Sequence, residues 1–342
     1  MTTLTAALAR ESRIALLDGP TPLRRLGTVG DGITLWVKQD DQGSLGGGGS
    51  KLRKLEFIAG AAVAAGADTL VTGGAIQSNH ARLTAATAAF LGLRCELLLP
   101  NIAGIEGATY SRSGNRLLDT VFNAVVHTPP SDMDLAEALE ERVLSLRQAG
   151  RAPFLVPFGG SDMTGCLGSL AGALELIEQW PHETPPDAVY LACGSGGMHA
   201  GILTALSVIW PTTSVVGISI LNPADVARSR VSELAEATAA QLGVPAPRDV
   251  TIDAAHIGAG YGALTEGGVA AMRWIGARYG LVLDPVYTSK AMAGFLDHLA
   301  RGRYQPGANV VFVHSGGLPG VFAYAEKLHT ALSSATDILE DA

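Results

Sequence analysis

Short apolar runs alternate along the chain with longer segments in which apolar residues recur every three or four positions. The runs are nearly continuous, as in strands buried on both faces of a parallel sheet. They predict strands at Leu35–Lys38, Thr69–Thr72, Cys95–Leu99, Ala124–His127, Phe154–Val156, Ala188–Ala192, Val215–Ile220, Val250–Ile252 and Val310–His314. The longer segments predict helices at Lys51–Ala65, Asn79–Leu91, Leu135–Gln148, Gly168–Trp180, Ala224–Leu242 and Glu266–Tyr279. This alternation predicts an α/β fold with helices on both faces of a mostly parallel sheet.

Composition narrows the class of protein. The 342 residues are 47% hydrophobic and 16% charged, which favours a buried core over disorder. The net charge of −8 offers no basic surface for nucleic acid. No stretch of about 18 apolar residues predicts a membrane span, and the first residues do not resemble a signal peptide. Three cysteines without a CxxC pair suggest neither disulfides nor zinc. We therefore expect a cytoplasmic protein that binds neither nucleic acid, membrane nor metal.

Glycine is unusually frequent, with 42 residues that cluster in short runs. Four runs directly follow predicted strands, namely Gly73-Gly74, Gly159-Gly160, Gly194–Gly197 and Gly316-Gly317. A fifth run, Gly46–Gly49, precedes a predicted helix. In parallel sheets, ligands bind at the carboxyl ends of the strands, in the loops that lead into helices. These loops are therefore the candidate binding site.

The segment Cys193–Gly201 follows an apolar strand and opens a predicted helix. Free backbone N–H groups and the helix dipole make such a turn an anion site, most often for phosphate. A dinucleotide fingerprint would need glycine where His199 stands, and the segment around Lys51 lacks the P-loop pattern. The loop therefore predicts a phosphate that no nucleotide motif explains. A plain tight turn between strand and helix is the alternative.

Three cations, Lys51, Arg53 and Lys54, stand in the first turn of a predicted helix, where positive charge is disfavoured. One interpretation is that Lys51 occupies a site that lowers its pKa, so that the neutral amine can react with a carbonyl group. The other is that the three side chains form a solvated face. Spacing alone slightly favours the solvated face.

Polar residues of the remaining loops have similar double interpretations. Ser78 and Asn79 are suited to cap a helix, and the same N-terminus could bind a carboxylate. His80 could carry a proton, although a lone histidine is more often only hydrogen-bonded. Tyr261 and Tyr287 lie in loops with glycine or proline, where tyrosines usually pack. A phosphate combined with an imine-forming lysine is the chemistry of pyridoxal 5′-phosphate, PLP.

Five segments carry a resemblance to a known family: GGGGSKLRKLEF, GADTLVTGGAIQSNHARLTAA, ACGSGGMHAG, LDPVYTSKAMAG and VHSGGLPG. They resemble the D-cysteine desulfhydrase and 1-aminocyclopropane-1-carboxylate (ACC) deaminase family of fold type II PLP-dependent enzymes. The match runs in order from Thr21 to Phe322. It implies two open, twisted, mostly parallel sheets flanked by helices, as in tryptophan synthase β. It also implies a homodimer, a large PLP-binding domain (1–51 and 165–342) and a small domain (52–164).

The resemblance implies roles for individual residues. Lys51 is similar to the lysine that carries PLP covalently and later acts as base, and Asn79 to the residue that bonds the PLP ring hydroxyl. Thr288 stands at the position that faces the pyridine nitrogen. The phosphate loop comprises Gly194, Ser195, Gly196, Gly197 and Met198. The residues expected around the amino-acid substrate are Ser78, Asn79, His80, Tyr261, Tyr287 and Ser315, with Ser78 and the two tyrosines also expected to be catalytic.

Two positions bear on the reaction. ACC deaminases typically carry Glu where Thr288 stands and Leu where Ser315 stands, so this pair predicts a β-elimination that converts D-cysteine to pyruvate, ammonia and sulfide. Ser50 and Met198 depart from the usual Asn and Thr, and each lost neutral hydrogen bond weakens cofactor binding by about 0.5–1.5 kcal/mol. The alternatives are a lyase for L-cysteate or chloroalanine, an ACC deaminase, and a PLP-binding protein without turnover.

Overall fold

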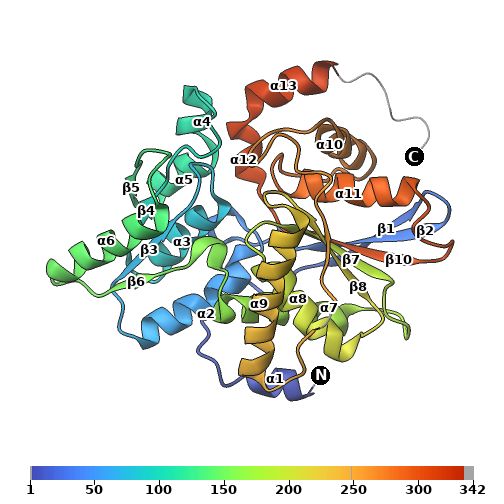
Figure 1. The fold of residues 1–342 in the computed structure, drawn as a ribbon, viewed down its shortest axis with the longest axis horizontal. Coiled ribbons are helices and arrows are strands. Elements are labelled where there is room, and N and C mark those ends of the chain that lie inside the picture. Colours follow the sequence, from blue (N-terminus) through green and yellow to red (C-terminus); the bar gives the residue numbers. More distant parts are fainter. Residues whose placement is uncertain (1, 248, 335–342) are drawn as a thin grey trace.

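The computed structural model describes residues 2–247 and 249–334 and contains two β-sheets (Figure 1). The larger sheet has the strand order β1-β2-β10-β7-β8-β9, and the smaller has the order β5-β4-β3-β6. The strands are β1 (Leu23–Val29), β2 (Ile33–Gln39), β3 (Thr69–Gly73), β4 (Arg94–Leu98), β5 (Val125–His127), β6 (Pro153–Leu155), β7 (Ala188–Cys193), β8 (Ser214–Ser219), β9 (Thr251–Asp253) and β10 (Asn309–His314). Every strand pair is parallel except β1–β2.

Helices cover the faces of both sheets. The α-helices are α1 (Thr2–Leu8), α2 (Lys51–Ala64), α3 (Asn79–Phe90), α4 (Ala108–Arg112), α5 (Gly114–Val121), α6 (Leu135–Gln148), α7 (Met163–Gln179), α8 (Gly197–Ile209), α9 (Ala224–Leu242), α10 (Glu266–Tyr279), α11 (Thr288–Ala300), α12 (Leu318–Ala323) and α13 (Ala325–Ser334). Two 3-10 turns, η1 (Leu45–Gly47) and η2 (Phe158–Gly160), lie in glycine runs.

The apolar strands of the larger sheet are buried on both faces, as their continuous pattern predicts. In β10, Val311 and Val313 pack with α7, α8 and α9, whereas Val310 and Phe312 pack with α10 and α11. Figure 1 shows these two helix groups on opposite sides of the sheet. Adjacent residues of one strand thus contribute to two separate cores, which is why the strand has no polar face.

The smaller sheet is also covered on both faces. Leu70 of β3 packs in the core shared with α2 and α3, and the adjacent Val71 packs against α6. The predicted α/β fold with mostly parallel strands is confirmed. We propose that the two sheets mark the predicted domains, 1–51 with 165–342 and 52–164, although residues 335–342 lie outside the described part.

Loops that leave β3, β7 and β10 at their carboxyl ends lead into α3, α8 and α12. The start of α2 joins them, because Ser50 N donates to Ser315 O just after β10 (3.0 Å). The fold therefore brings these four glycine runs to one region between the sheets, and Gly159 of the fifth run lines the same region. Within the residues described, no helix combines the length and apolarity that crossing a membrane requires.

Candidate active site

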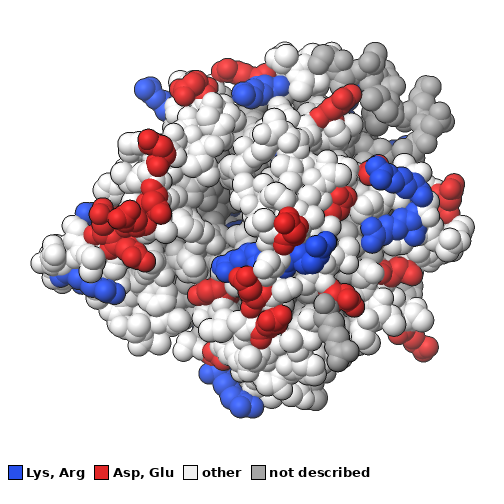
Figure 2. Space-filling model, in the orientation of Figure 1, with Lys and Arg blue, Asp and Glu red and all other residues white. Residues whose placement is uncertain are grey.

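A cavity of about 400 Å³ lies where the loops of the two sheets meet. Figure 2 shows the surface hollowed between the two halves of the molecule. The sequence-predicted residues that line it are Lys51, Ser78, Asn79, His80, Gly194, Ser195, Gly196, Met198, Tyr261, Tyr287 and Ser315. Gly197 and Thr288 are not among the lining residues. The structure thus brings together residues that are up to 264 positions apart, as the glycine loops predict.

One end of the cavity is formed by the start of α8. Gly196 caps this helix with φ +86°, a conformation that favours glycine, and presents the first-turn N–H groups to the cavity. Ser195 Oγ lies 2.7 Å from Ser161 Oγ beside this turn. A Cβ at Gly197 would lie 2.6 Å from Ser161 Oγ and 2.8 Å from Lys54 Nζ. Ser161 Oγ and Lys54 Nζ thus lie close against the backbone of Gly197, and a side chain at this position would displace them.

Lys54 supplies a positive charge at this end. Its Nζ donates to Ser161 Oγ (2.8 Å) and to Gly159 O (3.0 Å), which leaves a third N–H for a ligand. Burial, reinforced by the charge of Lys51, lowers the pKa of Lys54 to about 7. A dianionic phosphate would offset that burial cost, so the site is built for a bound anion.

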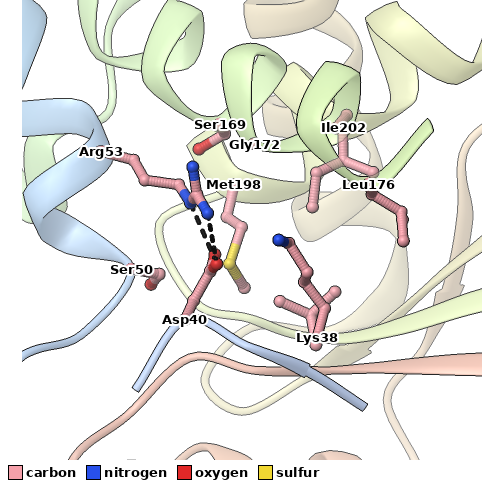
Figure 3. A pocket seen from close by; sticks show the side chains of 11 residues that line it. Lys38, Asp40, Ser50, Arg53, Ser169, Gly172, Leu176, Met198 and Ile202 are labelled. Carbon is pink, nitrogen blue, oxygen red and sulfur yellow. Dashed lines mark hydrogen bonds and ion pairs between the residues drawn. The ribbon is translucent and has the colours of Figure 1, made fainter. Parts of the chain in front are cut away.

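The solvated face that spacing favoured for Lys51, Arg53 and Lys54 is wrong. The side chains of Arg53 and Lys54 are buried, and that of Lys51 is half-buried and lines the cavity. Arg53 donates through Nε and NH2 to Asp40 Oδ1 (3.0 and 2.8 Å), as Figure 3 shows. It also donates to Glu175 of α7. Partners that are distant in sequence compensate these charges, so the helix start is tolerated in the interior.

Lys51 is the first residue of α2 and projects into the cavity between the two polar ends. Burial lowers its pKa, the negative charge of Asp284 opposes this shift, and the positive charge of Arg82 adds to it. A lysine with a lowered pKa holds more of its neutral, nucleophilic amine near neutral pH. This agrees with the predicted chemistry of Lys51.

The N-terminus of α3 forms the second polar end. Ser78 caps the helix, with its Oγ accepting from Ala81 N (3.1 Å), and the same side chain lines the cavity. Asn79 Oδ1 accepts from Asn115 Nδ2 (2.9 Å), which orients the Asn79 amide so that its own NH2 group stays available. The predicted cap is therefore confirmed, and the binding role of the same residues, which line the cavity, stays a prediction.

His80 is buried below this turn, with Nε2 3.0 Å from Thr72 Oγ1. Burial, together with the charges of Lys51 and Lys54, lowers the pKa of His80 to about 3. The imidazole is therefore neutral near pH 7. Thr72 Oγ1 donates to Val156 O (2.9 Å), so the one hydrogen of the neutral imidazole lies on Nε2 and is donated to Thr72. His80 can therefore offer the cavity an acceptor, but neither an N–H nor a positive charge for a carboxylate.

Tyr261 and Tyr287 form a pair at the wall of the cavity, with their hydroxyls 2.7 Å apart. Burial raises the pKa of Tyr261 to about 12, and it raises the pKa of Tyr287 well above the usual value of a tyrosine. Both side chains are therefore neutral phenols. One hydroxyl donates to the other, and the second O–H remains able to donate to a group in the cavity. The loop before Tyr287 is held by Asp284, whose carboxylate accepts from the backbone N–H groups of Val286 (2.9 Å) and Tyr287 (3.0 Å).

Thr288 is fully buried at the start of α11, and its hydroxyl donates to Asp284 Oδ1 (2.7 Å). The same hydroxyl accepts from Asp284 N (2.8 Å). Its hydrogen is therefore already committed. The predicted role of Thr288 beside the pyridine nitrogen remains a prediction.

Ser50 and Met198 line one small cavity together with Lys38, Asp40 and Arg53 (Figure 3). Met198 also lines the large cavity, whereas Ser50 Oγ is buried and finds no hydrogen-bond partner among the described residues. The two unusual positions of the sequence are therefore neighbours. Met198 brings an apolar side chain to the phosphate end, consistent with the predicted loss of a hydroxyl donor.

Sequence reasoning missed several residues of the site: Lys54 as a hydrogen-bond donor to an anion, Asn115, Ser161 and Asp284. The Gly159-Gly160 run after a predicted strand was a usable signal for Ser161. The unusual cations in the first turn of a helix were a usable signal for Lys54. Asn115 and Asp284 act through other site residues. No local pattern marks Asn115, and Asp284 stands in the quoted segment LDPVYTSKAMAG without any local sign of its role.

Comparison with known proteins agrees with this geometry. Residues 14–316 match the pyridoxal-phosphate dependent enzyme family. The chain therefore belongs to this family of PLP-dependent enzymes. The donors at the start of α8, with Lys54 and Ser161, fit the phosphate of PLP, and Lys51 fits its carbonyl group.

Among its relatives are enzymes named D-cysteine desulfhydrase. The one from Klebsiella pneumoniae (strain 342) is 40% identical over 323 residues, which cover 94% of this chain and 98% of the relative. The one from Yersinia enterocolitica is 41% identical over 325 residues, with the same coverage. A solved ACC deaminase homologue is 33% identical, has a TM-score of 0.87 and covers 97% of this chain and 100% of its own.

A more distant structure, threonine deaminase isoform 2 from Solanum lycopersicum, shares the fold at 16% identity. Its TM-score is 0.67, and the match covers 98% of this chain and 88% of that one. The predicted fold type II and the predicted cofactor, PLP, are confirmed.

Proposed function

We propose that the protein is a β-eliminating lyase that converts D-cysteine to pyruvate, ammonia and sulfide. The observation that carries this proposal is the meeting of three groups in one cavity: the half-buried Lys51, the glycine-rich start of α8 beside Lys54, and the start of α3 capped by Ser78. The relatives named D-cysteine desulfhydrase, about 40% identical over nearly the whole chain, support the substrate.

Bound PLP supplies an electron sink that stabilises negative charge at Cα of the substrate. The first turn of α8, Ser195, Ser161 and Lys54 would hold its phosphate, and the Asn79 amide would reach its ring hydroxyl. The substrate carboxylate would bind at Ser78 and the first N–H groups of α3, where a helix N-terminus favours negative charge.

Lys51 would take the Cα proton, because its lowered pKa supplies a neutral amine that can act as a base. The Cβ–S bond then breaks, and its electron pair leaves with sulfur. The neutral phenol pair Tyr261–Tyr287 would donate a proton to the departing thiolate. His80 would lie beside the carboxylate as a neutral group.

The second candidate is an ACC deaminase, which the solved homologue at 33% identity favours. The two activities differ in the keto acid released, pyruvate from cysteine and 2-oxobutyrate from ACC. The test is to supply the PLP-loaded protein with D-cysteine, L-cysteine, chloroalanine, L-cysteate and ACC, and to identify the products. We expect pyruvate and sulfide from D-cysteine. Release of 2-oxobutyrate from ACC without turnover of D-cysteine would refute the proposal.

We also propose that the protein is a cytoplasmic homodimer. The buried free thiols of Cys95, Cys166 and Cys193 suit a reducing compartment. Leu318 and Phe322 of α12 are 48% and 60% exposed, and such apolar residues suit an interface. Light scattering of the purified protein should give twice the mass of one chain, and the mass of one chain would contradict the dimer.

A further inference from the structure

Four apolar side chains gather at the cavity, outside its two polar ends. Ile102 follows β4, Leu135 begins α6, Phe158 lies in η2 and Leu221 follows β8. Ile102, Phe158 and Leu221 remain 49%, 40% and 45% exposed, and Leu135 is half-buried. Single exposed apolar residues need no explanation, but four that converge from separate segments on one cavity indicate contact with an apolar group.

The charged side chains of the cavity lie away from these four apolar residues. Its described lining contains no aspartate, glutamate or arginine, and its lysines, Lys51 and Lys54, belong to the proposed cofactor site. Figure 2 shows mostly uncharged surface around the hollow, with basic side chains below it. The exposed Arg230 reaches the phosphate end, where its NH2 donates to Ser161 O (3.1 Å). The apolar part therefore has no cation to pair with an acidic leaving group.

We propose that these four residues form a subsite for the β-substituent and select S-alkyl cysteines over cysteine and cysteate. This inference rests on the proposed function. The phosphate cradle and the start of α3 take the two anionic groups, so the substituent on sulfur is the part of the substrate left to face the apolar lining. An alkyl chain there buries apolar surface, whereas a sulfonate would lose its hydration without gaining a partner.

The reaction of an S-alkyl cysteine follows the same steps as the proposed elimination from cysteine. Lys51 takes the Cα proton, the Cβ–S bond breaks, and its electron pair leaves as RS⁻, which gains a proton. Water completes the conversion of the remaining three-carbon unit. One S-alkyl cysteine and one water thus give one thiol, one pyruvate and one ammonium ion. No oxidant or reductant takes part.

The first experiment measures kcat/KM of the PLP-loaded protein for cysteine and its S-methyl, S-ethyl and S-propyl derivatives. Each is tested as the D and the L enantiomer, and chloroalanine and cysteate serve as comparison substrates. Each buried methylene should raise kcat/KM about two- to fourfold, because burial of one methylene contributes up to ~0.8 kcal/mol. Cysteate should be the poorest substrate of the series.

The matched variants are Leu221→Ser in the subsite and Leu144→Ser on α6, where Leu144 is 55% exposed and does not line the cavity. We expect Leu221→Ser to lower the ratio of kcat/KM for S-propylcysteine to that for cysteine about three- to tenfold. Leu144→Ser should keep the wild-type ratio. A second readout needs no turnover, since the Kd of 3-(propylthio)propanoate from calorimetry should be lower than that of 3-mercaptopropanoate.

Three results would overturn the inference or its basis. Cysteine preferred over every S-alkyl derivative would overturn the subsite while leaving the lyase intact. A Leu221→Ser protein that loses both substrates alike would show that the apolar residues only close the site. Failure of every β-substituted amino acid, chloroalanine included, to yield pyruvate would refute the proposed function and the subsite with it.

Discussion

The phosphate cradle gives the most quantitative prediction, through the variant Lys54→Met. Methionine keeps the length of the side chain but removes its charge and its three N–H donors. In the structure two of those donors are used by Ser161 Oγ (2.8 Å) and Gly159 O (3.0 Å). The third is free for the PLP phosphate. The variant should therefore fold, because its side chain fits, but bind PLP more weakly.

The size of the effect follows from one charge-assisted hydrogen bond. Such a bond contributes about 1.5–3 kcal/mol. At about 1.36 kcal/mol for each factor of ten, the Kd for PLP should rise roughly 10- to 150-fold. Fluorescence or absorbance titration of the cofactor-free protein measures this Kd. The control is Lys327→Met, which removes an exposed lysine of α13 that does not line the cavity.

The same site predicts a pH dependence. The pKa of Lys54 is about 7 without the cofactor, and the bound phosphate must raise it because it favours the ammonium form. Binding is therefore tightest below pH 7 and weakens as the pH rises above 7, toward the pKa of the complex. Lys54→Met should lack this part of the pH dependence. An unchanged Kd and an unchanged pH profile in Lys54→Met would refute the role of Lys54.

Three further predictions follow from the contacts around the site. Arg53→Met leaves the buried charge of Asp40 without its cation, so the free energy of unfolding, measured with denaturant, should fall by about 3–5 kcal/mol. Arg301→Met, at an exposed ion pair, should lower it by less than about 1 kcal/mol, and equal losses in the two variants would contradict this account. Gly197→Ala places a Cβ among the phosphate donors and should abolish PLP retention in gel filtration, so full retention would refute the cradle. Tyr287→Phe removes a proton donor for the leaving thiolate and should lower kcat for cysteine about 10²-fold or more. The kcat for chloroalanine, whose leaving group needs no proton, should fall less. Equal losses of kcat for the two substrates would argue against that role.

The regular elements were predictable because their patterns are local. The helices Leu135–Gln148, Ala224–Leu242 and Glu266–Tyr279 have the predicted bounds, since each buries a single periodic stripe. Strand β1 was missed because it is a partly exposed antiparallel edge strand with an irregularity between Arg25 and Gly27. Its sequence therefore lacks the continuous apolar run of a central strand.

The site was predictable only where the chain itself marks it. Glycine loops after strands pointed to the right end of the sheet, and the resemblance supplied roles for Lys51 and Asn79. The burial of Arg53 was not predictable, because it depends on Glu175, 122 positions away. Asn115 likewise orients Asn79 across 36 positions, and no local pattern records that contact. Whether the cations at the start of α2 are buried or solvated thus depends on charge partners that are distant in the sequence, which the spacing of the cations does not reveal.

The central claim is that Lys51 performs a β-elimination on D-cysteine. The direct measurement compares pyruvate release from D- and L-cysteine by the PLP-reconstituted wild-type protein and by Lys51→Ala, with circular dichroism to confirm that both are folded. The account predicts pyruvate, ammonia and sulfide in equal amounts from D-cysteine with the wild type, and no turnover above background with Lys51→Ala. Turnover of D-cysteine by Lys51→Ala at the wild-type rate would contradict it.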